Sequence, residues 1–140
     1  MLTTPESVLI VVADGAGGSG DGNVAATTVI DRVEDFGSKT QKCPSWCDAL
    51  KKIDLAIGEG ESTAVVVEMN GDGISGASVG DSRAWIIRNR QIMDLTASQH
   101  RKPLLGSGKV SPVGFFHSSL DGLLIVATDG FCNYSNCKRN

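Results

Sequence analysis

The sequence lacks several features that would point to particular classes of protein. It has no excess of positive charge, because 13 Lys and Arg residues stand against 16 Asp and Glu residues, for a formal net charge of −3. Binding to nucleic acid is therefore not expected. No apolar run is long enough to cross a bilayer, and the first residues carry no basic segment typical of a signal peptide. We therefore expect a cytoplasmic protein without a membrane partner.

Cysteine pairs with the spacing of a zinc ribbon are also missing. Three residues separate Cys43 from Cys47 and four separate Cys132 from Cys137, whereas a ribbon has two. Reduced, structurally ordinary thiols are the simpler interpretation. A zinc site built from all four thiolates is the alternative.

The length and composition fit one globular unit. A chain of 140 residues with 41% hydrophobic and 21% charged residues can bury a substantial core. We expect residues 1–140 to form a single domain.

The most informative stretch is an apolar run at residues 8–12 that leads into Asp14 and a cluster of glycines. The run is rich in β-branched residues, which is typical of a strand buried on both faces. Residues 15–20 match the G-x-G-x-x-G pattern of dinucleotide-binding proteins. Alternatively, Asp14 and the carbonyl of Gly15 face a divalent cation, or the stretch is a glycine-rich connection with a capping aspartate. The stretch alone leaves the three interpretations open.

Hydrophobic periodicity predicts two helices after this stretch. The first spans 24–36, with Asp21 or Asn23 as its N-cap and Gly37 as its stop. The second begins after Ser45, which with Asp48 resembles a capping box, and ends at Gly58. Both apolar stripes are expected to face the core.

The remaining chain predicts mainly strands. They are expected at 63–69, 74–79, 84–87, 91–95, 113–116 and 123–127. Asn70-Gly71 predicts a hairpin in an antiparallel meander, and no Glu follows at the position that a calcium loop requires. The run at 123–127 is expected to be a second buried strand ending in Asp-Gly, and residues 131–140 show no clear period.

Three aspartates occupy comparable places in this pattern. Asp14 and Asp129 each follow an apolar strand and precede a glycine, and Asp81 lies in a break between strands. Asp-Gly is common in turns, but carboxylates gathered at one edge of a sheet pair would repel each other. A divalent cation removes that repulsion, and oxygen ligands suit Mg²⁺ and Mn²⁺. The pattern therefore predicts a shared metal site.

Three segments carry a resemblance to a known family. They are Val12-Ala13-Asp14-Gly15-Ala16-Gly17-Gly18, Gly80-Asp81-Ser82-Arg83-Ala84 and Ala127-Thr128-Asp129-Gly130-Phe131. In this order they resemble the motifs of the metal-dependent type 2C protein serine/threonine phosphatases of bacterial type. The resemblance implies an α+β fold, in which a two-sheet antiparallel β-sandwich is flanked by helices in α-β-β-α layers.

The resemblance also implies a site and an activity. Asp14 would bridge two Mn²⁺ or Mg²⁺ ions, Gly15 would offer its carbonyl to one ion, and Asp129 would bind the other. Asp81 together with Asp129 resembles the ligands of a third, weaker metal site. Asp14 and Asp129 would thus be the catalytic residues of a phosphoprotein phosphatase that hydrolyses phosphoserine and phosphothreonine with a metal-activated water.

The chain departs from the family at both ends. Family members begin with an earlier strand that carries an acidic ligand and a phosphate-binding arginine, and they end with an Asp-Asn motif. Neither is matched here, so we expect an incomplete domain, truncated at both ends. Two other hypotheses therefore stand beside the enzyme: a catalytically impaired phosphatase-like fragment that serves as a binding module or has no activity, and a nucleotide-binding domain.

Overall fold

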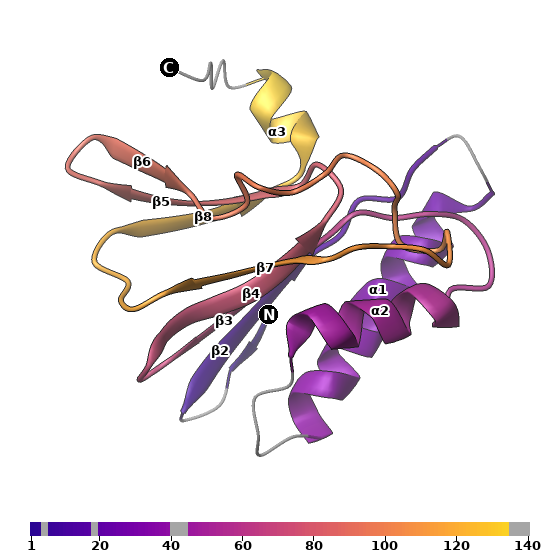
Figure 1. Cartoon of the computed structure of the whole chain (residues 1–140), viewed down its shortest axis with the longest axis horizontal. Helices are drawn as coiled ribbons and strands as arrows, with labels where there is room; N and C mark the ends of the chain where they lie inside the picture. The colour runs from indigo at the N-terminus through magenta and orange to yellow at the C-terminus, as the bar shows by residue number, and fades with distance from the viewer. Residues whose placement is uncertain (4–5, 18–19, 40–44, 135–140) are drawn as a thin grey trace.

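The computed structural model describes residues 1–3, 6–17, 20–39 and 45–134, which form two antiparallel sheets and three helices (Figure 1). The first sheet has the order β1-β2-β3-β4-β7 and the second the order β6-β5-β8. The strands of the first sheet are β1 (Leu2–Thr3), β2 (Ser7–Val12), β3 (Ala64–Asn70), β4 (Gly73–Val79) and β7 (Val113–His117). Those of the second are β5 (Arg83–Arg88), β6 (Gln91–Asp94) and β8 (Leu123–Ala127). The helices are α1 (Gly22–Lys39), α2 (Trp46–Ala56) and α3 (Asp129–Tyr134). The α+β class with two antiparallel sheets, predicted from the sequence, is confirmed.

Helices α1 and α2 lie side by side against one face of the first sheet (Figure 1). Their apolar stripes meet the sheet in one buried cluster. Its members include Ala25, Val29 and Val33 of α1, Trp46, Leu50 and Ile53 of α2, and Leu9, Val66 and Ala77 of the sheet. The expectation that both helical stripes face the core is confirmed.

The helix starts follow the predicted caps. The side chain of Asp21 accepts hydrogen bonds from the backbone N–H groups of Asn23 and Val24, at 3.1 and 3.3 Å. Ser45 Oγ accepts one from Asp48 N–H at 3.4 Å.

Helix α1 continues through Gly37, contrary to the predicted stop there. A Cβ at Gly37 would collide with the Leu9 side chain, so this glycine lets the helix approach the sheet closely.

A second buried cluster fills the space between the two sheets. Val65 and Val67 of β3 and Ile74 of β4 face Ala84 and Ile86 of β5. Val66, between the two valines, points to the helices instead. Strand β3 is thus buried on both faces, because successive side chains of a strand alternate between them.

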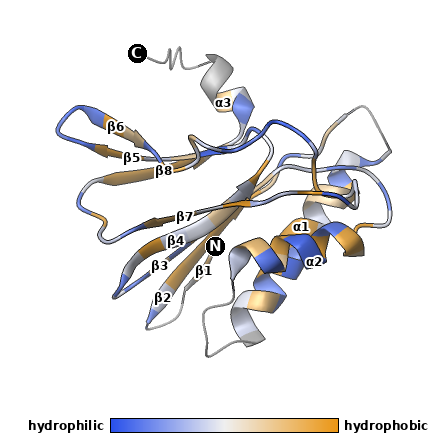
Figure 2. Ribbon diagram, viewed as in Figure 1, coloured by the Kyte–Doolittle hydropathy of each residue, from blue (hydrophilic) through white to orange (hydrophobic). Residues whose placement is uncertain are grey.

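The second apolar strand is less buried than the sequence predicts. Strand β8 lies at an edge of its sheet, and its Leu123 is 60% exposed. Figure 2 shows that β8 is largely hydrophobic along its length. Leu124 and Val126 pack into the cluster between the sheets, so Leu123 and Ile125, which pair with Ile87 and Trp85 of β5, lie on the opposite face. The prediction of a buried strand is wrong for β8, since an apolar run does not show whether a neighbouring element covers it.

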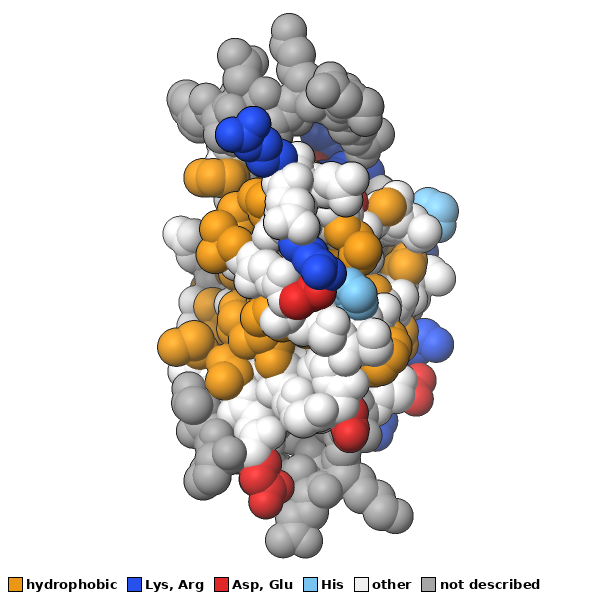
Figure 3. Space-filling view, turned by 90° about the vertical axis from the view of Figure 1, so that its left-hand side faces the viewer, with side chains coloured by type: hydrophobic (Ala, Val, Ile, Leu, Met, Phe, Trp, Pro, Cys, Tyr) orange, Lys and Arg blue, Asp and Glu red, His pale blue; other side chains and the backbone are white. Residues whose placement is uncertain are grey.

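Apolar side chains also reach the surface near the tips of these strands. Figure 3 shows hydrophobic side chains gathered beside charged ones on the end of the molecule that lies to the left in Figure 1. The most exposed hydrophobic residues of β6, β7, β8 and the connection before β8 are Ile92, Met93, Phe116, Leu120 and Leu123. Surfaces of this kind favour contact with another apolar surface.

The chain changes sheets between β4 and β5, at the position of Asp81. Gly80 makes the turn with φ +87°, and a Cβ there would lie 2.8 Å from Thr63 Cγ2 and 2.9 Å from Leu104 Cδ2. A larger residue fits neither the backbone angle nor the space. The predicted meander is therefore divided between two sheets, and the crossing places Asp81 beside the start of β3.

The last described element differs from the prediction. Residues 129–134 form α3, although no period was found after residue 130. A helix of 6 residues makes fewer than two turns, which is too short for periodicity to show. None of the described helices has the length and apolar character that a membrane-spanning helix needs.

Candidate metal centre

A cleft of about 440 Å³ lies where residues following β2, β4 and β8 meet the loop between β6 and β7. Its lining consists of Asp14, Gly15, Ala16, Glu61, Thr63, Asp81, Arg101, Lys102, Leu104 and Asp129. The four residues selected from the sequence, Asp14, Gly15, Asp81 and Asp129, are all among them. The fold thus brings three distant stretches of chain to one cleft, mostly at loops that follow strands.

The backbone of Asp14 is fixed by the start of β3. Asp14 N–H donates to Thr63 Oγ1 at 3.1 Å, and Thr63 N–H donates to the Asp14 carbonyl at 2.9 Å. Ser62 Oγ donates to the same carbonyl at 3.2 Å. Thr63 Oγ1 also lies 2.6 Å from Ser82 Oγ, next to Asp81. One buried threonine therefore couples the positions of two of the carboxylates.

The carboxylates influence each other. Burial raises the pKa of Asp14, and the charges of Asp129 and Asp81 and a side-chain hydrogen bond with Asp129 raise that pKa further. Asp14 therefore lies near both Asp129 and Asp81 in the cleft. A site that holds like charges this close favours a bound cation.

Asp81 differs from Asp14 because it is paired with a positive charge. Its Oδ2 forms an ion pair with Nε of Arg101, at 3.2 Å. Within the described part of the chain, no group of three or more His, Cys, Asp and Glu side chains is placed to hold a metal ion. The arrangement is a close pair of carboxylates with a third that faces an arginine.

The residues present fit a hard divalent cation. Every candidate ligand in the cleft is an oxygen atom, which is the donor type that Mg²⁺ and Mn²⁺ prefer. The repulsion that raises the pKa of Asp14 would be relieved by such an ion between Asp14 and Asp129. Asp81 would join only after its contact with Arg101 is released.

Gly15 is required by close backbone packing. It forms an isolated bridge with Ser62, and a Cβ at Gly15 would collide with the backbone of Gly22 at the start of α1. The first turn of α1 therefore lies directly against the loop that carries Asp14.

Replacing Gly15 with alanine is expected to lower the free energy of unfolding by about 2 kcal/mol, because the backbone of Gly22 must move. Chemical denaturation measures the change. Gly17→Ala is the matched control in the same loop, since a Cβ at Gly17 meets no atom within 4 Å. Equal stabilities of the two variants would contradict this packing.

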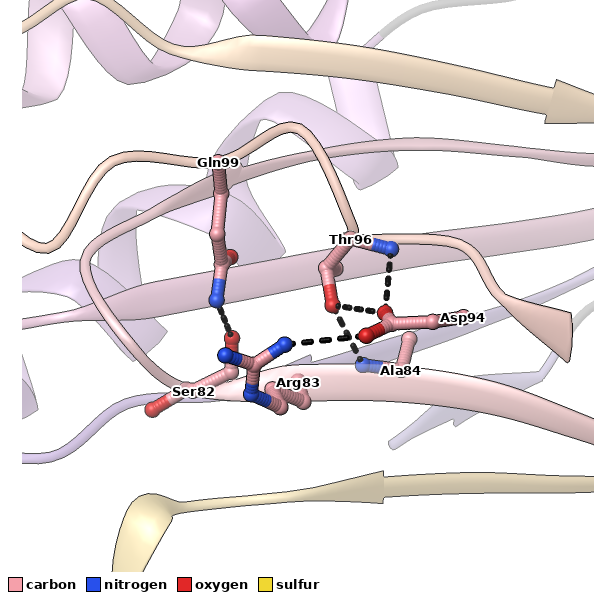
Figure 4. A network of polar contacts seen from close by, with 6 residues as sticks. All are labelled: Ser82, Arg83, Ala84, Asp94, Thr96 and Gln99. Carbon is pink, nitrogen blue, oxygen red and sulfur yellow. Dashed lines mark hydrogen bonds and ion pairs between the residues drawn. The ribbon is translucent and has the colours of Figure 1, made fainter. Parts of the chain in front are cut away.

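The loop between β6 and β7 is anchored at its start by a polar network (Figure 4). Asp94 Oδ1 accepts from Thr96 N–H and Oγ1–H at 2.9 and 2.8 Å, and Ala84 N–H donates to Thr96 Oγ1 at 3.3 Å. Arg83 pairs with the other Asp94 oxygen at 2.9 Å. These contacts agree with a structural role for Arg83.

Two further contacts bind the loop to the cleft wall. Gln99 Nε2 donates to the Ser82 carbonyl at 2.8 Å. Leu105 and Ser62 exchange two backbone hydrogen bonds, each 3.0 Å long. The segment that carries Arg101 and Lys102 is thus held on both sides.

Asp54 of α2 organises the end of the same loop. Its Oδ1 accepts from the N–H groups of Gly106 and Gly108 at 2.7 and 3.0 Å, and its Oδ2 accepts from Val110 N–H at 3.2 Å. Asp54 is 3% exposed. A buried carboxylate is tolerated because three N–H groups compensate for its lost hydration.

Sequence reasoning did not find Thr63, Asp54 or Arg101. Asp54 did give a signal, since it follows Leu50 by four residues and precedes Ile57 by three, on the apolar stripe of its helix. A charge on such a stripe requires partners. Thr63 and Arg101 gave none, because their contacts join separate parts of the chain.

Two alternatives from the sequence can be compared with the structure. A dinucleotide site requires a βαβ unit, but β2 pairs antiparallel with β3 and α1 is followed by α2, so the nucleotide-binding interpretation is wrong. The four-thiolate zinc site lies largely outside the described residues. Only Cys47 has a described side chain, and it is a free thiol whose pKa is raised by burial.

Known structures with the same fold include bacterial phosphatases. A bacterial serine phosphatase variant is similar with a TM-score of 0.79 at 25% identity, over 90% of this chain and 65% of that one. Serine/threonine phosphatase Stp1 from Staphylococcus aureus gives 0.77 at 22% identity, over 92% and 67%. The catalytic domain of serine threonine protein phosphatase PstP, in complex with 2 manganese ions, gives 0.73 at 18% identity, over 94% and 74%. No family model and no curated protein matches the sequence.

The class of protein follows from these comparisons. The chain has the fold of the bacterial serine/threonine phosphatases, so the resemblance to that family in the sequence is confirmed. It spans about two thirds of their length, with 65% and 67% of the first two covered.

Proposed function

We propose that residues 1–140 form one phosphatase-like domain that hydrolyses phosphoserine and phosphothreonine in protein substrates with the help of Mn²⁺ or Mg²⁺. The observation that carries the proposal is that Asp14, Asp81 and Asp129 line one cleft, where burial and the two neighbouring carboxylates raise the pKa of Asp14. The fold of the neighbouring phosphatases, one of them in complex with 2 manganese ions, supports the same assignment.

In this proposal the carboxylates of Asp14 and Asp129 and the carbonyl of Gly15 would hold the ions. Asp81 would contribute to a further position once Arg101 releases it. When bound, the ions would supply charge neutralisation of the phosphate and activation of water for attack on phosphorus. The chain's own part is to hold these residues in place, and Thr63 and Ser62 do so for Asp14 by fixing its backbone N–H and carbonyl.

The proposal predicts metal-dependent turnover by the chain. With p-nitrophenyl phosphate, release of nitrophenol is expected to need Mn²⁺ or Mg²⁺ and to stop when EDTA removes the ion, because the paired carboxylates leave the cleft acidic without it. Dephosphorylation of a phosphothreonine peptide under the same conditions is expected to follow.

The outcomes of this experiment distinguish between the hypotheses that the sequence leaves open. Equal turnover with EDTA and with Mn²⁺ would contradict a metal mechanism. Binding of Mn²⁺ without turnover would favour the phosphatase-like binding module, which is consistent with the lack of a preassembled three-residue metal group in the described chain.

A further inference from the structure

The cleft contains two positive charges whose role the metal site does not explain. Its lining has four carboxylates, and Arg101 and Lys102 are the only Lys or Arg residues among its described lining residues. Both come from the loop between β6 and β7. A phosphate monoester is anionic, so its approach to a cleft this acidic is opposed by repulsion that nearby cations reduce.

Arg101 is bound in a way that leaves it able to take a ligand. Its contact with Asp81 uses Nε, at 3.2 Å, and Arg101 forms no second hydrogen bond or ion pair with the described residues. The two terminal amino groups of the guanidinium therefore remain for an anion. Two parallel N–H groups of an arginine match two oxygens of a phosphate.

The contact with Asp81 has little value for stability. The Arg101 side chain is 82% exposed, and an ion pair this exposed adds little to the free energy of unfolding. A purely structural role therefore explains poorly why an arginine faces the cleft here.

The backbone around Arg101 is held in advance. Gln99 contacts Ser82 on one side, and the paired hydrogen bonds between Leu105 and Ser62 follow on the other. Asp54 fixes the loop beyond them. A cation on a fixed backbone loses less conformational entropy on binding than one on a free loop.

We propose that Arg101 binds the phosphoryl group of the substrate through the terminal amino groups of its guanidinium, with Lys102 adding a second charge. The loop between β6 and β7 then supplies the phosphate-binding residue of the cleft, and Asp81 orients it through Nε as long as Asp81 holds no metal ion. This inference rests on the proposed function, since it assigns the phosphate of that substrate to a residue.

The test is calorimetric titration of inorganic phosphate into the full chain with Mg²⁺ present. Arg101→Ala is expected to raise the dissociation constant for phosphate on the order of tenfold, because two charge-assisted hydrogen bonds are lost. Arg101→Lys is expected to lie between, since it retains the charge without the paired N–H groups. Arg32→Ala, which removes an exposed arginine of α1 outside the cleft, is expected to bind phosphate like the wild type.

Two further measurements make the result specific. Mg²⁺ affinity is determined for each variant, because Arg101 also neutralises Asp81, and thermal unfolding confirms that each is folded. Phosphate affinity of Arg101→Ala within twofold of wild type at equal Mg²⁺ occupancy would overturn the inference, as would a wild-type chain that does not bind phosphate.

Turnover of p-nitrophenyl phosphate separates this inference from the proposed function. Phosphate binding that depends on Arg101 in a chain without turnover supports the inference and contradicts the activity. Metal-dependent turnover with phosphate affinity and KM unchanged by Arg101→Ala supports the activity and contradicts the inference. A raised KM with retained kcat is the expected result.

Discussion

Replacing Asp14 or Asp129 with alanine is expected to lower kcat/KM for p-nitrophenyl phosphate in Mn²⁺ by at least about 100-fold, because losing only a supporting residue of a metal site already costs up to that much. Both carboxylates line the cleft. Removing either takes away one of the carboxylates that line the cleft. Initial rates at saturating Mn²⁺ measure the change.

The control for these variants is Asp31→Ala. Asp31 is an exposed residue of α1 and does not line the cleft, so its loss removes a carboxylate without touching the site. The alanine at position 14 also removes a like-charge repulsion, so the metal-free variant is expected to be no less stable than the wild type. Turnover within tenfold of wild type in both site variants would reject the proposed metal centre.

Replacing Asp54 with alanine is expected to lower the free energy of unfolding by about 3 kcal/mol, because three backbone N–H groups lose their acceptor together. Two of those donors are Gly106 and Gly108, which follow the segment that carries Arg101. We therefore expect the same variant to bind phosphate more weakly, since the loop is no longer fixed. Urea denaturation and phosphate titration measure the two effects.

The matched control is Asp48→Ala on the same helix. Asp48 is exposed in the first turn of α2, where a carboxylate stabilises the helix by about 0.5 kcal/mol through the helix dipole. Asp54→Asn is expected to fall between the two, because its amide keeps one oxygen acceptor and places an NH₂ group where the other was. Equal stabilities of Asp54→Ala and Asp48→Ala would show that the loop does not depend on Asp54.

Much of the fold could be predicted because its signals are local. Asp21 and Ser45 cap the helices where the sequence places them, and the apolar residues of α1 and α2 face the core. Asn70 and Gly73 close a hairpin as expected, with Asp72 N–H donating to the Asn70 side chain at 2.9 Å. Each of these features depends on residues within a few positions of one another.

The errors arise where a distant part of the chain decides the outcome. The strand at 123–127 is apolar like a buried strand, but its position at a sheet edge leaves Leu123 largely exposed. A glycine at position 37 is typical of the end of a helix, but here its small size lets α1 pack closely against Leu9. The division of the meander at Gly80 depends on room between Thr63 and Leu104.

In the candidate site, too, the sequence predicts some features and distant contacts decide the others. Asp14-Gly15 and Asp129-Gly130 stand out in the sequence because both follow apolar strands, and that pattern predicts that they meet. No sequence pattern predicts the other contacts of the site. These are the ion pair of Asp81 with Arg101, the hydrogen bonds that Asp54 accepts from residues 106–110, and the hydrogen bond between Thr63 and Ser82.

The sequence by itself determined helices α1 and α2, most strands and the carboxylates at the ends of two of those strands, since neighbouring residues dictate backbone conformation and the spacing of apolar side chains. Only the tertiary structure decided which side chain each carboxylate faces. Hydrogen bonds and ion pairs act over about 3 to 4 Å between atoms, whatever the separation along the chain. The partners of Asp14, Asp54 and Asp81 are therefore set by how the two sheets, the helices and the loop after β6 pack together.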